Sequence, residues 1–389
     1  MMIKQLRRLI LGAGLLVVST AALATACSAV QSCAANPGCA NSVVSPGMTQ
    51  LMVYQQSHPE CFGSANSTAG ASQAIGGTTI QQMLTISNAI SARASALLAG
   101  PARTSASSQQ QLGLAAGNAP SKINVWGSLS GDNSEYAGRS FVNGGGNTIN
   151  IKSSLDVTNV VLGADYAISP STVLGLSAAF DDGSGSTESF VNGASNAGSK
   201  GSTTKGYTVA PYLGWQIDKS WSVDATLGFG HVKLSTVDSL TGSADRMFYG
   251  ANLSYAHWYG NWQLTGKGSY LYGQEKYGNL NGTTGTLADT ASNNKMDQAR
   301  ISGQAAYWMD GFMPYLGLAY SSDLSRSTSG DAATQAATAD LGKNAWVWSL
   351  GANFISLKNN MTGGIVYNQE SGRTAGKRDS LMANINVRF

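Results

Sequence analysis

The sequence carries little charge and no long apolar run beyond its N-terminus. Asp, Glu, Lys and Arg make up 12% of the 389 residues, about half the share usual in soluble proteins. A membrane-spanning helix needs about 18 or more continuous apolar residues, so none is expected after the N-terminal segment. Because only helices and closed barrels satisfy their backbone polar groups inside lipid, any spanning structure here must be a closed β-barrel.

The N-terminus has the pattern of an export signal. Lys4, Arg7 and Arg8 precede an apolar run over 9–24, and small residues continue to Ala26. A basic head, a short apolar middle and an A-x-A end predict a cleaved signal peptide over residues 1–26. Removing its three cations leaves 24 − 3 = 21 Lys and Arg against 21 Asp and Glu. Because the positive and negative charges of the mature chain are equal in number, we expect no nucleic-acid partner.

Cysteine is confined to the first sixth of the chain, at Cys27, Cys33, Cys39 and Cys61. In an oxidising compartment these four predict up to two disulfides, with three possible connectivities. A zinc site that includes His58 is the competing interpretation. Leu23 to Cys27 also resembles a lipoprotein motif, although lipidation of Cys27 would leave an odd number of thiols.

Residues 27–120 are rich in Ser, Ala, Gly and Gln and contain too little apolar mass for a substantial core. Within them, Thr79 to Leu98 has helical periodicity and is followed by Gly100 and Pro101 as a stop. A helix of this length is about 30 Å long, which matches the height of a bilayer core. We predict a helix in the lumen of the barrel, and an amphipathic helix in the periplasm is the alternative. The residues that we expect this helix to place in the pore are Ile80, Met83, Asn88 and Arg93.

The last eleven residues alternate strictly. Leu381, Ala383, Ile385, Val387 and Phe389 fall on one face of a strand and polar residues fall mainly on the other. About ten residues is the length of a tilted membrane-spanning strand with lipid on one side and water on the other. The segment therefore predicts an outer-membrane barrel.

Similar segments recur from residue 121 onward, separated by turns that alternate between short and long. Short turns lie near 169–171, 218–220, 260–261, 310–311 and 358–360, and long polar loops near 181–205, 235–246, 274–297, 321–344 and 369–377. Short periplasmic turns with longer external loops are typical of outer-membrane barrels. We predict an all-β membrane protein, a twelve-stranded antiparallel barrel over 121–389, whose last strand closes on its first. The predicted strands are 122–131, 153–167, 172–181, 205–217, 221–234, 246–259, 261–274, 297–309, 312–321, 344–356, 361–368 and 379–389.

Charged residues on the expected inner faces could line a lumen. They are Asp156, Asp224, Lys267, Arg300 and Arg388. Because both signs occur, we expect them to pair with one another, with water or with the helix. The sequence contains no metal-site or cofactor-binding motif.

The chain resembles the autotransporter family, whose C-terminal translocator is a twelve-stranded outer-membrane barrel. The resemblance covers about 120–389 and is carried by Asn124-Val-Trp-Gly127, Leu155 to Asp165, Thr172-Val-Leu-Gly175, Gly206 to Gly214 and Asn384-Ile-Asn-Val-Arg-Phe389. It implies a Gram-negative outer membrane, contact with its lipids, a helix in the pore, and Phe389 as a signal to the barrel-assembly machinery. No long passenger precedes the barrel, so passenger secretion is not expected. Asn88 lacks the second Asn of the family's cleavage pair and is interpreted as a polar residue on the helix surface.

The most consistent function is a non-enzymatic barrel whose long external loops contact a host, neighbouring cells or matrix, through an extracellular ligand that the sequence does not identify. A channel for small solutes is the alternative. An outer-membrane hydrolase is a distant third, since His231 with Ser235 is its strongest basis and His257 fits an interfacial aromatic belt.

Overall fold

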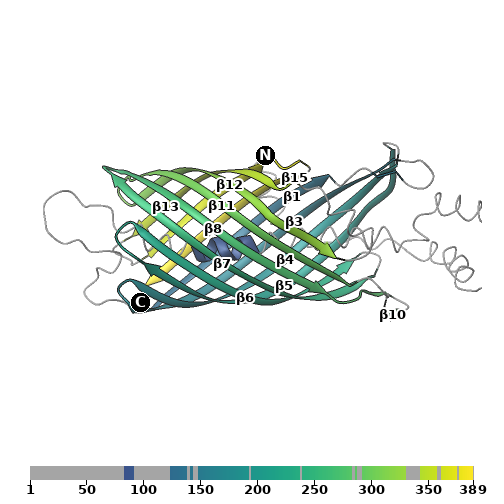
Figure 1. Cartoon of the computed structure of the whole chain (residues 1–389), viewed down its shortest axis with the longest axis horizontal. Coiled ribbons are helices and arrows are strands. Elements are labelled where there is room, and N and C mark those ends of the chain that lie inside the picture. Colours follow the sequence, from purple (N-terminus) through teal and green to yellow (C-terminus); the bar gives the residue numbers. More distant parts are fainter. Residues whose placement is uncertain are drawn as a thin grey trace, which may run out of the picture. The chain divides into compact units, whose positions relative to one another are not determined.

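The computed structural model describes residues 83–91 and 123–388, except for 138–140, 143–147, 192–193, 237–238, 283–284, 287–290, 330–341, 357–360 and 375. All of them belong to one compact unit, Asn66–Phe389. Residues 83–91 form a helix, and all the described strands belong to a single sheet (Figure 1). None of the helical residues described is part of a helix long and apolar enough to span a membrane.

Twelve long antiparallel strands make the barrel wall. Each pairs with the next in the chain, and β1 pairs with β15 over Asn124↔Arg388 to Tyr136↔Gly376, which closes the barrel as predicted. Three short strands add to the sheet, β2 Phe141–Val142, β9 Asn281–Gly282 and β10 Gly285–Thr286. The long strands are β1 Ile123–Ala137, β3 Thr148–Ser169, β4 Thr172–Val191, β5 Ala194–Gln216, β6 Trp221–Thr236, β7 Thr241–Tyr259, β8 Trp262–Tyr277, β11 Ser292–Tyr307, β12 Phe312–Ser329, β13 Asn344–Ser356, β14 Met361–Ser371 and β15 Gly376–Arg388.

The strands have an apolar outer face and an inner face turned to the lumen, because neighbouring side chains alternate across the sheet. In β13, Trp346, Trp348 and Leu350 are exposed on the outside, whereas Ala345 and Val347 are buried. In β15, Leu381 and Ile385 are exposed and Asn386 is buried. The faces predicted for these strands are confirmed, and the outer one suits contact with lipid.

Aromatic side chains gather on the outer face at two levels. Near the short turns, the rings of Trp221 and Tyr255 lie 4.8 Å apart, and those of Trp262 and Tyr307 lie 5.0 Å apart. Towards the other end, Tyr249 stacks on Tyr272 at 4.9 Å. Two aromatic belts are the arrangement expected at the two surfaces of a bilayer.

The strands at the end opposite the short turns are longer than predicted. The segment 181–205 was expected to be a loop, but β4 and β5 stay paired from Asp181↔Gly206 to Val191↔Ala194. Likewise, β6 and β7 extend through most of 235–246. Beyond the lipid, the outer face of the strands meets water and needs no apolar side chains. The apolar alternation that marks a strand in the sequence therefore disappears, although backbone pairing continues.

The short turns hold their shape through local hydrogen bonds. In the β5–β6 turn, the backbone N–H groups of Ser220 and Trp221 donate to Asp218 Oδ1 at 2.7 and 2.8 Å. These two hydrogen bonds hold the pKa of the exposed Asp218 carboxyl below its ordinary value, and the one from Ser220 has the larger effect. Since the folded-state pKa is lowered, the stabilisation is present above the ordinary pKa and is lost as the pH falls through the lowered one.

Candidate functional site in the barrel lumen

The helix at 83–91 is packed inside the barrel. Met83, Ile86, Ala89 and Ile90 are at most 3% exposed, and they share one hydrophobic cluster with inward-facing side chains of the wall. That cluster draws on seven strands through Trp126, Val161, Ala179, Ala210, Tyr212, Phe248, Leu271 and Met296. One side of the lumen is therefore a close-packed core rather than a water-filled passage.

Missing side chains on the wall make room for the helix. A Cβ atom built on Gly273 of β8 would lie 2.0 Å from Met83 Sδ, and one on Gly250 of β7 would lie 3.2 Å from Ser87 Oγ. Met83 thus rests directly against the backbone of β8, where any side chain on the wall would displace it. The helix therefore packs against the wall where Gly250 and Gly273 leave space for its side chains.

Polar contacts fix the helix at both ends of its described part. Thr85 Oγ1 donates to Asp132 Oδ2 of β1 at 3.3 Å, and Ser91 Oγ donates to Asp224 Oδ2 of β6 at 3.5 Å. Lys267 Nζ of β8 also donates to Ser91 Oγ. These contacts join the helix to three separate strands.

The direction of the helix follows from its contacts along β8, which starts at the short-turn end with Trp262. Met83 contacts Gly273, whereas Ser91 contacts Lys267, six residues nearer the short turns. Six strand residues span about 20 Å, or about 14 Å along the axis of a barrel with strands tilted by about 45°. Eight helical steps span about 12 Å. The helix therefore runs roughly along the barrel axis, with Ser91 nearer the short turns and Met83 further from them.

A buried polar chain links three strands of the wall. Trp126 Nε1 donates to Tyr212 Oη at 2.6 Å, Tyr212 Oη donates to Asp165 Oδ2 at 3.1 Å, and Asn124 Nδ2 donates to Asp165 Oδ1 at 2.6 Å. Asn124, Trp126 and Asp165 are among the residues that carry the family resemblance. Their side chains converge here, which ties the start of the barrel to β3 and β5.

Buried ion pairs line the lumen. Arg246 of β7, whose side chain is fully buried, bonds Asp181 at 3.1 Å and Glu275 at 2.9 Å. Arg378 of β15 bonds Asp132 at 2.6 Å. Sequence reasoning missed these groups because most lie at the ends of the predicted strands or inside predicted loops.

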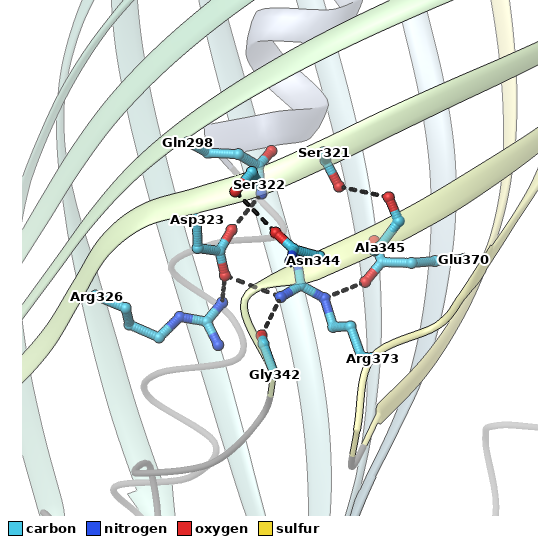
Figure 2. A network of polar contacts seen from close by, with 10 residues as sticks. All are labelled: Gln298, Ser321, Ser322, Asp323, Arg326, Gly342, Asn344, Ala345, Glu370 and Arg373. Atoms are coloured by element: carbon cyan, nitrogen blue, oxygen red, sulfur yellow. Dashed lines mark hydrogen bonds and ion pairs between the residues drawn. The ribbon is translucent and has the colours of Figure 1, made fainter.

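A second network joins β11, β12 and the β14–β15 connection (Figure 2). Asp323 accepts from Arg373 at 2.8 Å, from Arg326 at 3.1 Å and from Gln298 at 2.8 Å. Arg373 also donates to Glu370. Each buried charge in this network has a partner, as burial in a low-dielectric interior requires.

The residues predicted to line the lumen fall in different places. Asp224, Lys267 and Arg300 face inward, and Asn252 Nδ2 donates to Asp224 Oδ1 at 2.7 Å. Asp156 instead faces outward, where Asn133 Nδ2 donates to it at 2.6 Å. The reason is that β3 carries apolar residues on both faces, since its inner face contacts the lumen core. The backbone of Arg388 pairs with Asn124.

Several predicted residues lie outside the part of the chain that the structure describes. They are Ile80, Arg93, Phe389, the side chain of Arg388, Cys27, Cys33, Cys39 and Cys61. Within the described part, no group of three or more His, Cys, Asp and Glu side chains could hold a metal ion.

The geometry does not assemble the hydrolase dyad. His231 Nδ1 lies 3.0 Å from Asp245 Oδ1 on the outer face. Ser235 is four residues further along the same strand, which places it about 13 Å away. His257 stacks against Tyr255 in the aromatic belt, at a ring distance of 6.4 Å.

Beside the helix, the lumen keeps a cavity of about 260 Å³. Asn88, the one residue of the described helix that is not fully buried, borders it from the helix side. The opposite wall comes from β8 and β11 to β15, including Lys267, Arg300, Gln304, Asn353 and Asn384. The helix thus fills one side of the lumen and leaves on the other a space lined by both polar and apolar side chains.

Comparisons with known proteins agree with this architecture. The family model for the autotransporter beta-domain matches residues 125–368, which is more than half of the chain. No curated protein sequence matches it significantly.

Three of the solved structures that match the chain are autotransporter barrels. The translocator domain of NalP from Neisseria meningitidis is 14% identical, with 69% of this chain and 89% of that chain covered and a TM-score of 0.49. The transport unit of AIDA-I from Escherichia coli is 14% identical, with 78% and 98% covered and a TM-score of 0.47. The beta domain of Bordetella BrkA is 13% identical, with 68% and 99% covered and a TM-score of 0.45.

The family match extends from the opening of β1 to β14 and includes the strands that seat the helix. The chain therefore belongs to the autotransporter β-domain family of outer-membrane barrels.

Proposed function

We propose that the protein is a non-enzymatic display barrel, which holds the segment before its helix at the cell surface and presents long external hairpins to a host, to neighbouring cells or to matrix. The observation that carries the proposal is the direction of the helix. Its described part runs from Met83, which lies further from the short turns, to Ser91, which lies nearer to them and to the start of β1. If the short turns are periplasmic, the residues before Met83 leave the barrel on the outside.

The packing of the lumen supports the same proposal. A helix buried against seven strands and tied to Asp132, Asp224 and Lys267 anchors the chain that precedes it. The paired extensions of β4 with β5 and of β6 with β7 supply a rigid polar surface beyond the lipid. Contact surfaces carried on a rigid scaffold are a common arrangement for binding.

Surface protease accessibility tests the proposal. One variant carries an epitope tag between residues 66 and 78, ahead of the helix, and a matched control carries the tag in the β5–β6 turn at Lys219. In intact cells, we expect added protease to remove the first tag and to spare the second. Both tags should be removed once the outer membrane is permeabilised. Protection of the first tag in intact cells, with cleavage only after permeabilisation, would contradict display.

Passage of small solutes is a second candidate function, favoured by the cavity beside the helix. The amide and charged side chains on its wall would suit hydrophilic solutes, and its volume is below that of pockets for drug-sized ligands, about 300–1,000 Å³. Conductance of the intact barrel separates this candidate from a closed display barrel.

A further inference from the structure

The cavity beside the helix has an unbalanced charge. Its lining includes two cations, Lys267 of β8 and Arg300 of β11, and no Asp or Glu. Lys267 pairs with Ser302 across the two strands, and Arg300 pairs with Ser269, so the two cations are diagonal neighbours on the inner face. Such neighbours lie about 7–8 Å apart. Two like charges therefore face one small cavity.

The two cations differ in their partners. Lys267 donates to Ser91 and lies close enough to Asp224 to interact with its charge. Four other inward-facing arginines each form an ion pair, namely Arg246, Arg326, Arg373 and Arg378. Arg300 forms none with the described residues of the chain. At longer range it is repelled by Arg378 and attracted by Glu370. A guanidinium enclosed in a lumen without an ion-pair partner is unfavourable, and a bound anion would lower that cost.

Neutral donors surround the same space. The side chains of Gln304 and Asn384 border the cavity, and neither forms a hydrogen bond with the residues that the structure describes. Their amide groups can donate to an oxygen acceptor. A guanidinium presents a planar fork that matches the two oxygens of a carboxylate or phosphate.

We propose that the cavity is a binding site for a small oxyanion, a carboxylate or a phosphate, held by the Arg300 guanidinium with support from Lys267. Its volume of about 260 Å³ suits a small anion with a few waters. Asn88 places the helix on the edge of the site, so the bound anion lies between the helix and the β11–β15 wall. The site does not depend on whether the segment before the helix is displayed.

Calorimetric titration of the full-length protein in detergent tests the proposal, with sodium phosphate and sodium acetate as separate probes at constant sodium chloride. We expect saturable binding of at least one probe, and the comparison shows which oxyanion the site prefers. Arg300→Gln should weaken this binding about tenfold or more, since a hydrogen bond to a charged group is lost. Arg300→Lys keeps the charge but not the planar fork of the guanidinium. Its affinity for the anion should fall between those of the unmodified protein and Arg300→Gln.

Lys295→Gln is the matched control, because Lys295 lies on the same strand but is exposed on the outer face. It should bind the anion as the unmodified protein does. The proposal is overturned if neither probe binds saturably to the unmodified protein. It is also overturned if folded Arg300→Gln and Arg300→Lys both bind with unchanged affinity.

Discussion

Replacing residues 83–91 with a Gly-Ser linker of equal length should turn a nearly closed barrel into a persistent pore. Barrels of eight strands are filled by their own side chains, whereas barrels of 16 to 18 strands leave an aqueous channel. A twelve-stranded wall lies between these sizes, and here the helix supplies the filling through Met83, Ile86 and Ile90. Without the helix, the open space in the lumen would no longer be limited to the cavity of about 260 Å³.

Single-channel recording in planar bilayers measures this effect. We expect rare or small openings for the intact protein and several-fold larger, stable conductance for the linker variant. Asn88→Ala is the matched control, because Asn88 borders the cavity rather than the packed core, and it should leave the barrel nearly closed. Large stable pores in the intact protein, unchanged in the linker variant, would show that the helix is not a plug and would favour the solute channel.

Replacing Arg246 with Met should lower the free energy of unfolding by about 3–5 kcal/mol, the usual cost of removing one partner from a buried ion pair. Arg246 bonds both Asp181 and Glu275, and all three side chains are at most 1% exposed. The substitution leaves two carboxylates in the lumen without their guanidinium. Met keeps most of the volume, so the loss reports charge rather than a cavity.

Urea unfolding in detergent micelles, followed by tryptophan fluorescence, gives the comparison. Lys205→Met is the control, since it removes the ion pair with Asp182 on the outer face, where the side chains are 76% and 64% exposed. That pair should contribute no more than about 1 kcal/mol. Equal losses for the two variants would show that the Arg246 network does not stabilise the barrel more than a surface ion pair does.

Much of the barrel could be predicted from alternation. In segments such as 344–356 and 379–389, one face meets lipid and the other meets polar groups, so apolar residues recur at every second position. The helix was also detectable from periodicity at Met83, Leu84 and Ile90. Their burial in the lumen reflects the need of an apolar helix face for an apolar partner.

The errors in the sequence prediction have physical causes. The sequence pattern favours Asp156 on the inner face, opposite apolar neighbours, but Val157 and Val161 face the packed lumen while Val160 and Leu162 face outward. The ion pairs could not be matched from the sequence because their partners are distant along the chain. Arg378 and Asp132 are 246 positions apart and meet only because the last strand closes on the first.

Residues 83–91 lie in the lumen, with Met83 towards the long-strand end and Ser91 towards the short turns. Photo-crosslinking in intact cells tests this placement directly, with a photoreactive amino acid at position 83 or at position 91. After trypsin digestion, position 83 should crosslink to the peptide 268–276, which contains Gly273, and position 91 to the peptide 220–233, which contains Asp224. Crosslinks in the reverse order, or none to the inner wall from either position, would contradict the account.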